Sequence, residues 1–192
     1  MPAVAGRLRS NRRADTVILK AAMDEKIGGE PTVNNLLWTG PFRISNLLAA
    51  CLDDGHPWPP ASRGVYVISR DAWQGAPSPA CRPLYFGGNT GVSQRFCTRI
   101  GDLVADLHGL WDGNTGHHSG GQSLYLWCRA NKVHPSSLYI GWATRTPWCD
   151  RCAEIDLVSL LSTSWEERGT LLNKSRPPAC RTHDHGGEGS GL

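Results

Sequence analysis

Two short stretches rich in β-branched and aromatic residues stand out in the middle of the chain, Gly64–Ile68 and Leu84–Gly87. Short apolar runs of this composition, bounded by turn-forming residues, are typical of β-strands. The loop that separates them, Asp71–Pro83, is rich in glycine, proline and serine. The pattern therefore predicts a hairpin with one tyrosine on each strand, Tyr66 and Tyr85.

Helical periodicity follows the hairpin. Apolar residues recur three and four positions apart over Ser93–Leu107, which predicts a helix with one buried face. Further on we expect a short helix over Gln122–Ala130, a third strand over Ser137–Trp142 and a helix over Arg151–Leu161. This order of elements predicts an α+β fold, in which helices flank a small three-stranded antiparallel sheet.

The first part of the chain predicts a helical extension ahead of this core. Ala14–Ile27 has a helical pattern and ends at two glycines, and a second helix is expected over Pro41–Leu52. A proline-rich break follows, which is typical of a linker or a surface turn. The expected organisation is a helical N-terminal extension over 1–60, a compact domain over 61–185 and a disordered tail over 186–192.

The composition is that of an ordinary soluble globular protein, with 40% hydrophobic and 19% charged residues. No apolar run is long enough to cross a membrane, and the N-terminus lacks the apolar core of a signal peptide. We therefore expect a cytoplasmic protein with no membrane partner. In that compartment, the seven cysteines are expected to be thiols or metal ligands instead of disulfides.

The net charge of +3 is too small to indicate nucleic-acid binding by itself. A basic arm near the start is more suggestive, because such arms often contact phosphates. Its residues are Arg7, Arg9, Arg12 and Arg13. A solvated, disordered tail explains the same cluster equally well, so both interpretations stay open.

Several residues along the hairpin and the later elements follow a recognisable order. Gly64–Tyr66 and Tyr85–Gly87 open the series, and Arg95 follows on the helix predicted over Ser93–Leu107. Glu154 then lies at the start of an apolar helix, and Asn173 closes the series. The order and spacing resemble the GIY-YIG nuclease family, with its two tyrosine motifs, helix arginine, metal-binding glutamate and closing asparagine. One such motif is weak, whereas the ordered set is more specific.

The resemblance implies a metal-dependent endonuclease that hydrolyses phosphodiester bonds of double-stranded DNA with Mg²⁺ or Mn²⁺. It implies Tyr66 as the base, Tyr85 as the group that positions water or phosphate, and Arg95 as a donor to a phosphoryl oxygen. Glu154 would bind the metal ion and Asn173 would orient the site. The residue types suit these roles, because Mg²⁺ prefers hard oxygen ligands and a tyrosine needs nearby positive charge to lose its proton.

The histidine of the family has no clear counterpart. Many relatives carry it where Arg99 stands, so Arg99 is a departure from the pattern and is expected to contact DNA from an exposed face. His118 is the expected replacement in preference to His117, because Ser119 follows it as in the phage homing enzymes of the family. Two ordinary loop histidines would explain the same residues.

Cysteine and histidine pairs form a second constellation. Cys149 and Cys152 form a CxxC, and Cys180 and His183 form a CxxH. Thiolate and imidazole ligands at this spacing predict a structural zinc site, which would tie the C-terminal end to the start of the last predicted helix. His185 is the alternative fourth ligand, and four unlinked residues are the competing interpretation.

The resemblance covers residues 62–178 and favours a nuclease, in particular a type II restriction enzyme, since these are small and carry helical additions. A mobile-element or DNA-repair nuclease is the near alternative. A zinc-stabilised nucleic-acid-binding module without catalysis and a purely structural protein would have no use for the full set of polar residues. A monomer with one site must cut two strands in turn, which favours a homodimer.

Overall fold

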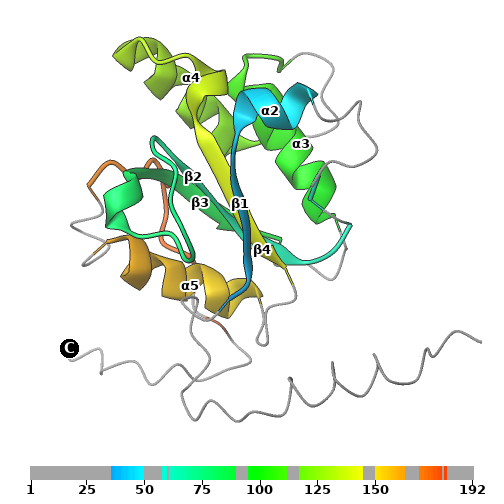
Figure 1. Ribbon diagram of the computed structural model, residues 1–192, viewed down its shortest axis with the longest axis vertical. Helices are drawn as coiled ribbons and strands as arrows, with labels where there is room; N and C mark the ends of the chain where they lie inside the picture. Colours follow the sequence, from blue (N-terminus) through cyan, green and yellow to red (C-terminus); the bar gives the residue numbers. More distant parts are fainter. Residues whose placement is uncertain are drawn as a thin grey trace, which may run out of the picture. The chain divides into compact units, whose positions relative to one another are not determined.

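The computed structural model describes residues 36–49, 58–59, 61–89, 95–111, 117–144, 150–162, 169–178 and 180. The chain divides into two compact units, Met1–Glu30 and Pro31–Leu192, and every described residue belongs to the second. In chain order its elements are β1 (Trp38–Arg43), α2 (Ile44–Ala49), β2 (Gly64–Ser69), η3 (Pro79–Cys81), β3 (Pro83–Gly88), α3 (Phe96–Leu107), α4 (Ser119–Asn131), η4 (Pro135–Ser137), β4 (Tyr139–Thr144) and α5 (Asp150–Leu161) (Figure 1).

The strands form a four-stranded sheet in the order β1-β4-β2-β3, and every neighbouring pair is antiparallel. β2 and β3 are the predicted hairpin, in which Tyr66 lies opposite Gly87 and Ile68 opposite Tyr85. β4 pairs with the other edge of β2, so β2 is internal and all of its residues are buried. The predicted α+β class with an antiparallel sheet is therefore confirmed.

The predicted number of strands is wrong, because the segment Trp38–Arg43 adds a fourth strand, β1, beside β4. This segment was expected to belong to a helical extension, with a helix over Pro41–Leu52. The helix α2 begins only at Ile44. The physical reason is a backbone irregularity: Gly40 adopts a positive φ of 92°, and the pairing register shifts between Thr39 and Phe42. A bulged edge strand accommodates such a residue, and a helix does not.

The later elements follow the sequence pattern closely. Of the predicted helices, Ser93–Leu107 corresponds to α3, Gln122–Ala130 to α4 and Arg151–Leu161 to α5, while the predicted third strand corresponds to β4. The predicted helix Ala14–Ile27, the basic arm and the tail over 186–192 lie outside the described residues.

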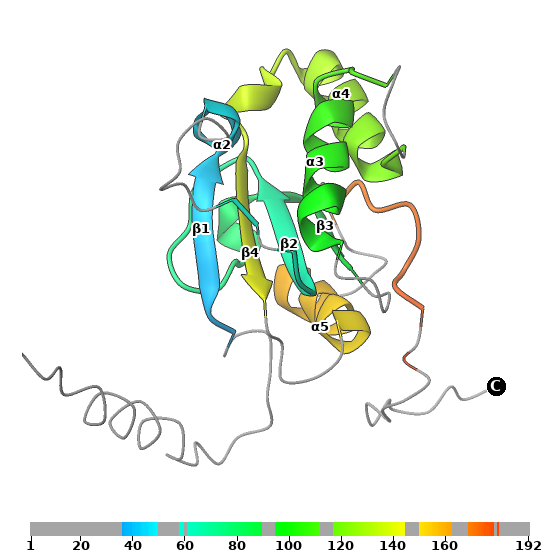
Figure 2. The ribbon, with the colours of Figure 1, turned by 90° about the vertical axis from the view of Figure 1, so that its right-hand side faces the viewer.

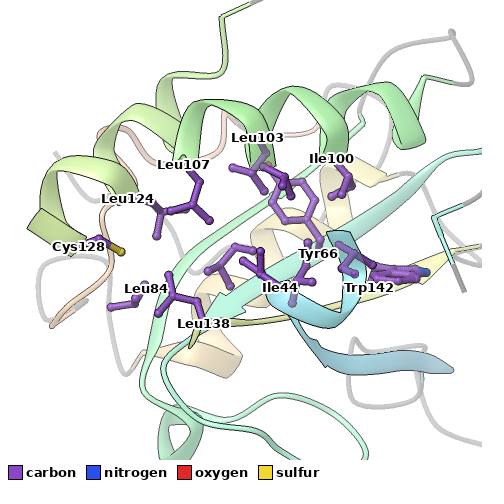
Figure 3. Close-up of a cluster of buried hydrophobic side chains, with 14 of the residues drawn as sticks. Ile44, Tyr66, Leu84, Ile100, Leu103, Leu107, Leu124, Cys128, Leu138 and Trp142 are labelled. Carbon is purple, nitrogen blue, oxygen red and sulfur yellow. The ribbon is translucent and has the colours of Figure 1, made fainter. Parts of the chain in front are cut away.

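The two faces of the sheet support separate cores, because alternate residues of a strand point to opposite sides. Tyr66 and Ile68 belong to a core formed with α3 and α4, whereas Val65 and Val67 belong to a core formed with α5. Figures 1 and 2 show α3 and α4 over one face of the sheet and α5 over the other. In Figure 3, Tyr66 lies beneath α3, next to Ile100 and Leu103.

A C-terminal segment covers the outer edge of β3. The Leu172 N–H donates to the Leu84 carbonyl at 2.7 Å, and the Thr170 hydroxyl donates to the Pro83 carbonyl at 3.0 Å. These bonds satisfy backbone groups that an open edge strand would leave unpaired. Residues 169–178, orange in Figure 2, are thereby brought beside the hairpin although they are distant in sequence.

Candidate functional site

The two tyrosines of the hairpin lie side by side on the α3 face of the sheet. Tyr66 is fully buried and Tyr85 is half-buried, and their rings stack with centroids 6.3 Å apart. Side chains at diagonal positions of neighbouring antiparallel strands can touch in this way. The sequence placed both tyrosines on one surface correctly, but Tyr66 forms the inner layer and Tyr85 the outer one.

Two glycines make room for these rings. A Cβ atom on Gly87 would lie 2.6 Å from the Tyr66 hydroxyl, and one on Gly120 would lie 2.2 Å from Cζ of Tyr85. Both separations are far shorter than van der Waals contact, so a side chain at either position would displace a tyrosine. The glycine of the second tyrosine motif is thus required by the close approach of the Tyr66 ring to β3.

His118 is the residue that holds the Tyr66 hydroxyl. It is the N-cap of α4, where its Nδ1 accepts a hydrogen bond from the Gly121 N–H, and its Nε2 lies 3.0 Å from the Tyr66 hydroxyl. Because Nδ1 accepts, a neutral ring carries its proton on Nε2 and donates it to the tyrosine oxygen. The choice of His118 over His117 agrees with this geometry, since His117 is exposed.

The surroundings keep His118 neutral. Burial, and next the positive charge of Arg99, lower the pKa of His118 from 6.5 to about 4. The backbone N–H of His118 donates to Oδ2 of the buried Asp106 at 2.7 Å, which fixes the start of α4 against α3. Since His118 is neutral at pH 7, it serves as a hydrogen-bond donor and carries no charge toward a phosphate.

Arg99, and not Arg95, lies against the tyrosines. Arg95 is the exposed N-cap residue of α3, and it is not among the described residues that line the cleft. Arg99 follows one helical turn later and lines that cleft. Residues four apart share a helix face but differ by about 6 Å along the axis, which decides which arginine reaches the hairpin. Arg95 thus lies outside the described lining of the cleft, and its contact with a phosphate stays a prediction.

Both tyrosine hydroxyls are neutral in the folded chain. Burial raises the pKa of Tyr66 well above its ordinary value of 10.0, and the charge and hydrogen bond of Arg99 oppose this only in part. Burial also raises the pKa of Tyr85, again against the lowering effect of Arg99. Glu154 raises both values as well, so its carboxylate is electrically close to the pair.

A cleft of about 190 Å³ opens where the two layers meet, at the end of β3. Tyr85 and Arg99 line it from the α3 face, and Glu154 lines it from α5 on the opposite face. The side chains meet because β3 ends in two glycines: Gly87 faces the tyrosines, and a Cβ atom on Gly88 would lie 3.1 Å from Glu154 Oε1. Because Gly87 and Gly88 carry no side chains, residues from both faces of the sheet can line the same cleft.

Asn173 also lines the cleft and is fixed to the hairpin. Its Oδ1 accepts from the Phe86 N–H at 3.2 Å, and its Nδ2 donates to the Phe86 carbonyl at 2.8 Å. This pair of bonds continues the edge pairing begun by Leu172 and holds the backbone between Tyr85 and Gly87. Asn173 therefore positions the outer tyrosine through the main chain.

Three polar residues that line the cleft were absent from the predicted site: Arg151, Ser175 and Arg176. Arg151 lies one helical turn before Glu154, with Nη1 3.7 Å from Glu154 Oε2. The available signals were the spacing of Arg151 from Glu154 and the basic residues that follow Asn173. Neither signal stands out in the sequence, because charges at these spacings are common on solvated helices and loops.

The donors present suit a weakly ligated divalent ion. Glu154 supplies the carboxylate among the described residues that line the cleft, and the described part of the chain holds no group of three His, Cys, Asp or Glu side chains suited to a metal. Mg²⁺ commonly binds through one or two carboxylates, water and substrate phosphate, so one carboxylate fits this mode. A metal held by protein ligands alone does not fit the described residues of the cleft.

The zinc prediction rests partly on residues outside the described ones. Cys152 is buried in α5 and Cys180 is half-buried after the cleft segment. Cys149, His183 and the alternative ligand His185 are not among the described residues. The zinc site therefore stays a prediction, as does the contact of the basic arm with DNA.

Comparison with known proteins gives no match: no family model, curated protein or solved structure is similar to this chain. Within the ranges that the structure describes, no helix is both long and apolar enough to cross a bilayer. The interpretation of the cleft therefore depends on its own geometry and charges.

We predict a pH dependence of stability that originates at His118. The unfolded ring titrates near 6.5 and the folded one near 4, so the unfolded chain binds the extra proton between these values. The contribution of neutral His118 to the free energy of unfolding should therefore be complete above pH 6.5. It should decrease by up to about 3 kcal/mol as the pH falls to about 4. Urea unfolding of the wild type and His118→Gln across this range measures the difference. Parallel curves for the two proteins would contradict the assignment.

Proposed function

We propose that this chain is a metal-dependent phosphodiester hydrolase of the GIY-YIG type that cuts double-stranded DNA in the cytoplasm. The observation that carries the proposal is that the residues of separate motifs lie together in one cleft. Tyr85, Glu154 and Asn173, which the resemblance selects from distant parts of the chain, line one cleft, and Tyr66 stacks directly behind Tyr85. Residues that matched the motifs only by chance would not be expected to line one cleft.

The charges of the cleft suit a phosphodiester. Arg99 presents a guanidinium group that is always ionised and can donate a fork of hydrogen bonds to the non-bridging oxygens. Such a group stabilises the charge that builds on these oxygens as the phosphorus is attacked. Arg99 thus takes the role that the resemblance had assigned to Arg95.

Glu154 is the residue that would hold Mg²⁺ or Mn²⁺, together with water and a phosphate oxygen. When bound, such an ion neutralises phosphate charge and assists departure of the leaving oxygen. Glu154 is nearly buried and lies against the Gly88 backbone, so its carboxylate has a fixed position at the end of β3. It is therefore oriented before substrate binds.

The roles of the tyrosines are reassigned. Tyr66 has no exposed surface, so it cannot contact an attacking water unless the site opens. Tyr85 lines the cleft, and in the proposed reaction its hydroxyl would face the attacking water and the phosphate. Tyr66 and His118 form the layer behind it, which holds Tyr85 and Arg99 in place through the buried hydroxyl.

Within this proposal we favour a type II restriction enzyme, with a mobile-element or repair nuclease as the alternative. The reason is the helix predicted over Ala14–Ile27 ahead of the core, because helical additions are typical of the restriction enzymes in the family that the chain resembles. Sequencing the ends of DNA fragments separates these roles, since a restriction enzyme cuts at one recognition sequence. Analytical ultracentrifugation with and without DNA tests the proposed homodimer.

We predict that Arg99→Gln and Glu154→Gln each reduce cleavage of supercoiled plasmid DNA in Mg²⁺ by about 10² or more, because both act on charge in the transition state. Arg95→Gln is the matched control on the same helix and should cut at nearly the wild-type rate. Thermal unfolding checks that all variants are folded. Loss of cutting in Arg95→Gln with normal cutting in Arg99→Gln would reverse the assignment. A wild type without any cleavage would favour a binding module instead.

The tyrosines should separate stability from catalysis. Tyr66→Phe leaves the His118 Nε2–H buried without its acceptor, so the free energy of unfolding should fall by about 1–3 kcal/mol. Tyr85→Phe should change stability less but lower the cleavage rate by about 10². Urea unfolding and single-turnover cleavage measure the two effects. If Tyr66→Phe is stable and the more damaging to the rate, Tyr66 is the reacting hydroxyl.

We further propose the structural zinc ion held by Cys149, Cys152, Cys180 and His183, which would fasten the segment after the cleft to the start of α5. Protein purified without added metal should contain about one zinc per chain, and Cys149→Ser should lose it and melt at a lower temperature. Cys128→Ala, at a buried position of α4, is the control that should retain the ion. Elemental analysis that finds no zinc would leave these four residues without a shared role.

A further inference from the structure

The cleft holds more positive charge than cleavage of one phosphodiester requires. Three guanidinium groups line it among the described residues, those of Arg99, Arg151 and Arg176, against the single carboxylate of Glu154. One phosphodiester carries one negative charge, and Arg99 with an ion at Glu154 already complements it. With Glu154 bound to that ion, Arg151 and Arg176 are the remaining positive groups among the described residues that line the cleft, and a second anion would complement them.

Arg151 is held at the rim of the cleft by its position on α5. Its Nη1 lies 3.7 Å from Glu154 Oε2, and the side chains are 31% and 11% exposed respectively. The ion pair directs the guanidinium toward the cleft while leaving part of it accessible to solvent. An anion bound beside the proposed reacting phosphate could thus contact Arg151 next to the Glu154 carboxylate, without a large movement of the Arg151 side chain.

Arg176 approaches from a different element. It is exposed and follows Asn173, whose hydrogen bonds fasten the segment to Phe86 of β3. Ser175 lines the same wall and adds a hydroxyl that can donate to an anion. A helix and a fastened edge segment therefore bring two arginines and a hydroxyl to one side of the cleft.

We propose that Arg151 and Arg176 bind the phosphate next to the one that is cleaved, so that the cleft holds two successive phosphates of one DNA strand. The identity of the first phosphate rests on the proposed function. Successive phosphates are the anions that a polynucleotide presents in series, whereas a single small anion would neutralise only part of the charge. The second phosphate would set the register of the strand over Glu154 and Tyr85.

The first test measures binding alone. Affinity for a fluorescent 20-base-pair duplex is measured against salt concentration, with Ca²⁺ in place of Mg²⁺. Arg151→Gln and Arg176→Gln should each weaken binding about tenfold and reduce the slope of log K against log salt by about one. Arg129→Gln, an exposed arginine of α4 outside the cleft, is the control and should change neither. If both cleft variants behave like Arg129→Gln, the second phosphate site is refuted.

The second test separates the neighbouring phosphate from the reacting one. In Mg²⁺, Arg151→Gln and Arg176→Gln should raise about tenfold the protein concentration that gives half of the maximal single-turnover rate, because they contribute uniform binding, whereas Arg99→Gln should lower the maximal rate itself. A large loss of this rate with unchanged affinity would place both arginines on the reacting phosphate and overturn the proposal. A wild type that binds with the arginine-dependent salt slope but does not cut would refute the nuclease and support the phosphate site.

Discussion

The candidate site depends on the absence of side chains at the end of β3. Gly87 and Gly88 occupy successive positions of an edge strand, so one faces the α3 core and the other faces the α5 core. A Cβ atom on the first would collide with the Tyr66 hydroxyl, and one on the second would press against Glu154. A sheet normally keeps the residues on its two faces apart. The paired glycines remove that separation at one point, and the cleft lies there.

Burial of Tyr66 stabilises the fold but makes its hydroxyl a poorer general base. The Tyr66 hydroxyl is fully enclosed and bonded to His118, which stabilises the join between the hairpin and α4. The same burial raises the pKa of Tyr66 and so disfavours the phenolate that a general base requires. The inner hydroxyl therefore supports the structure, and in the proposed reaction the half-buried Tyr85 would contact the substrate.

The C-terminal segment links stability to the proposed binding of phosphates. Leu172 and Asn173 complete the edge of β3 by hydrogen bonding, and the same segment continues into Ser175 and Arg176 at the cleft. Loosening this edge would remove a backbone constraint beside Tyr85 and displace a cleft arginine together. The proposed zinc ligands at Cys180 and His183 follow shortly afterwards, which would give the segment a second attachment.

The sequence by itself determined the hairpin, the three later helices and the residue types of the site, because alternation, helical periodicity and turn residues are local properties. It did not determine the fourth strand, since β1 is defined by pairing with β4, a hundred residues further along the chain. Nor did it select Arg99 over Arg95 or Tyr85 over Tyr66 as the residues that face the cleft. Those choices follow from the rotation of a helix over a sheet and from the depth of each strand, which only tertiary packing fixes.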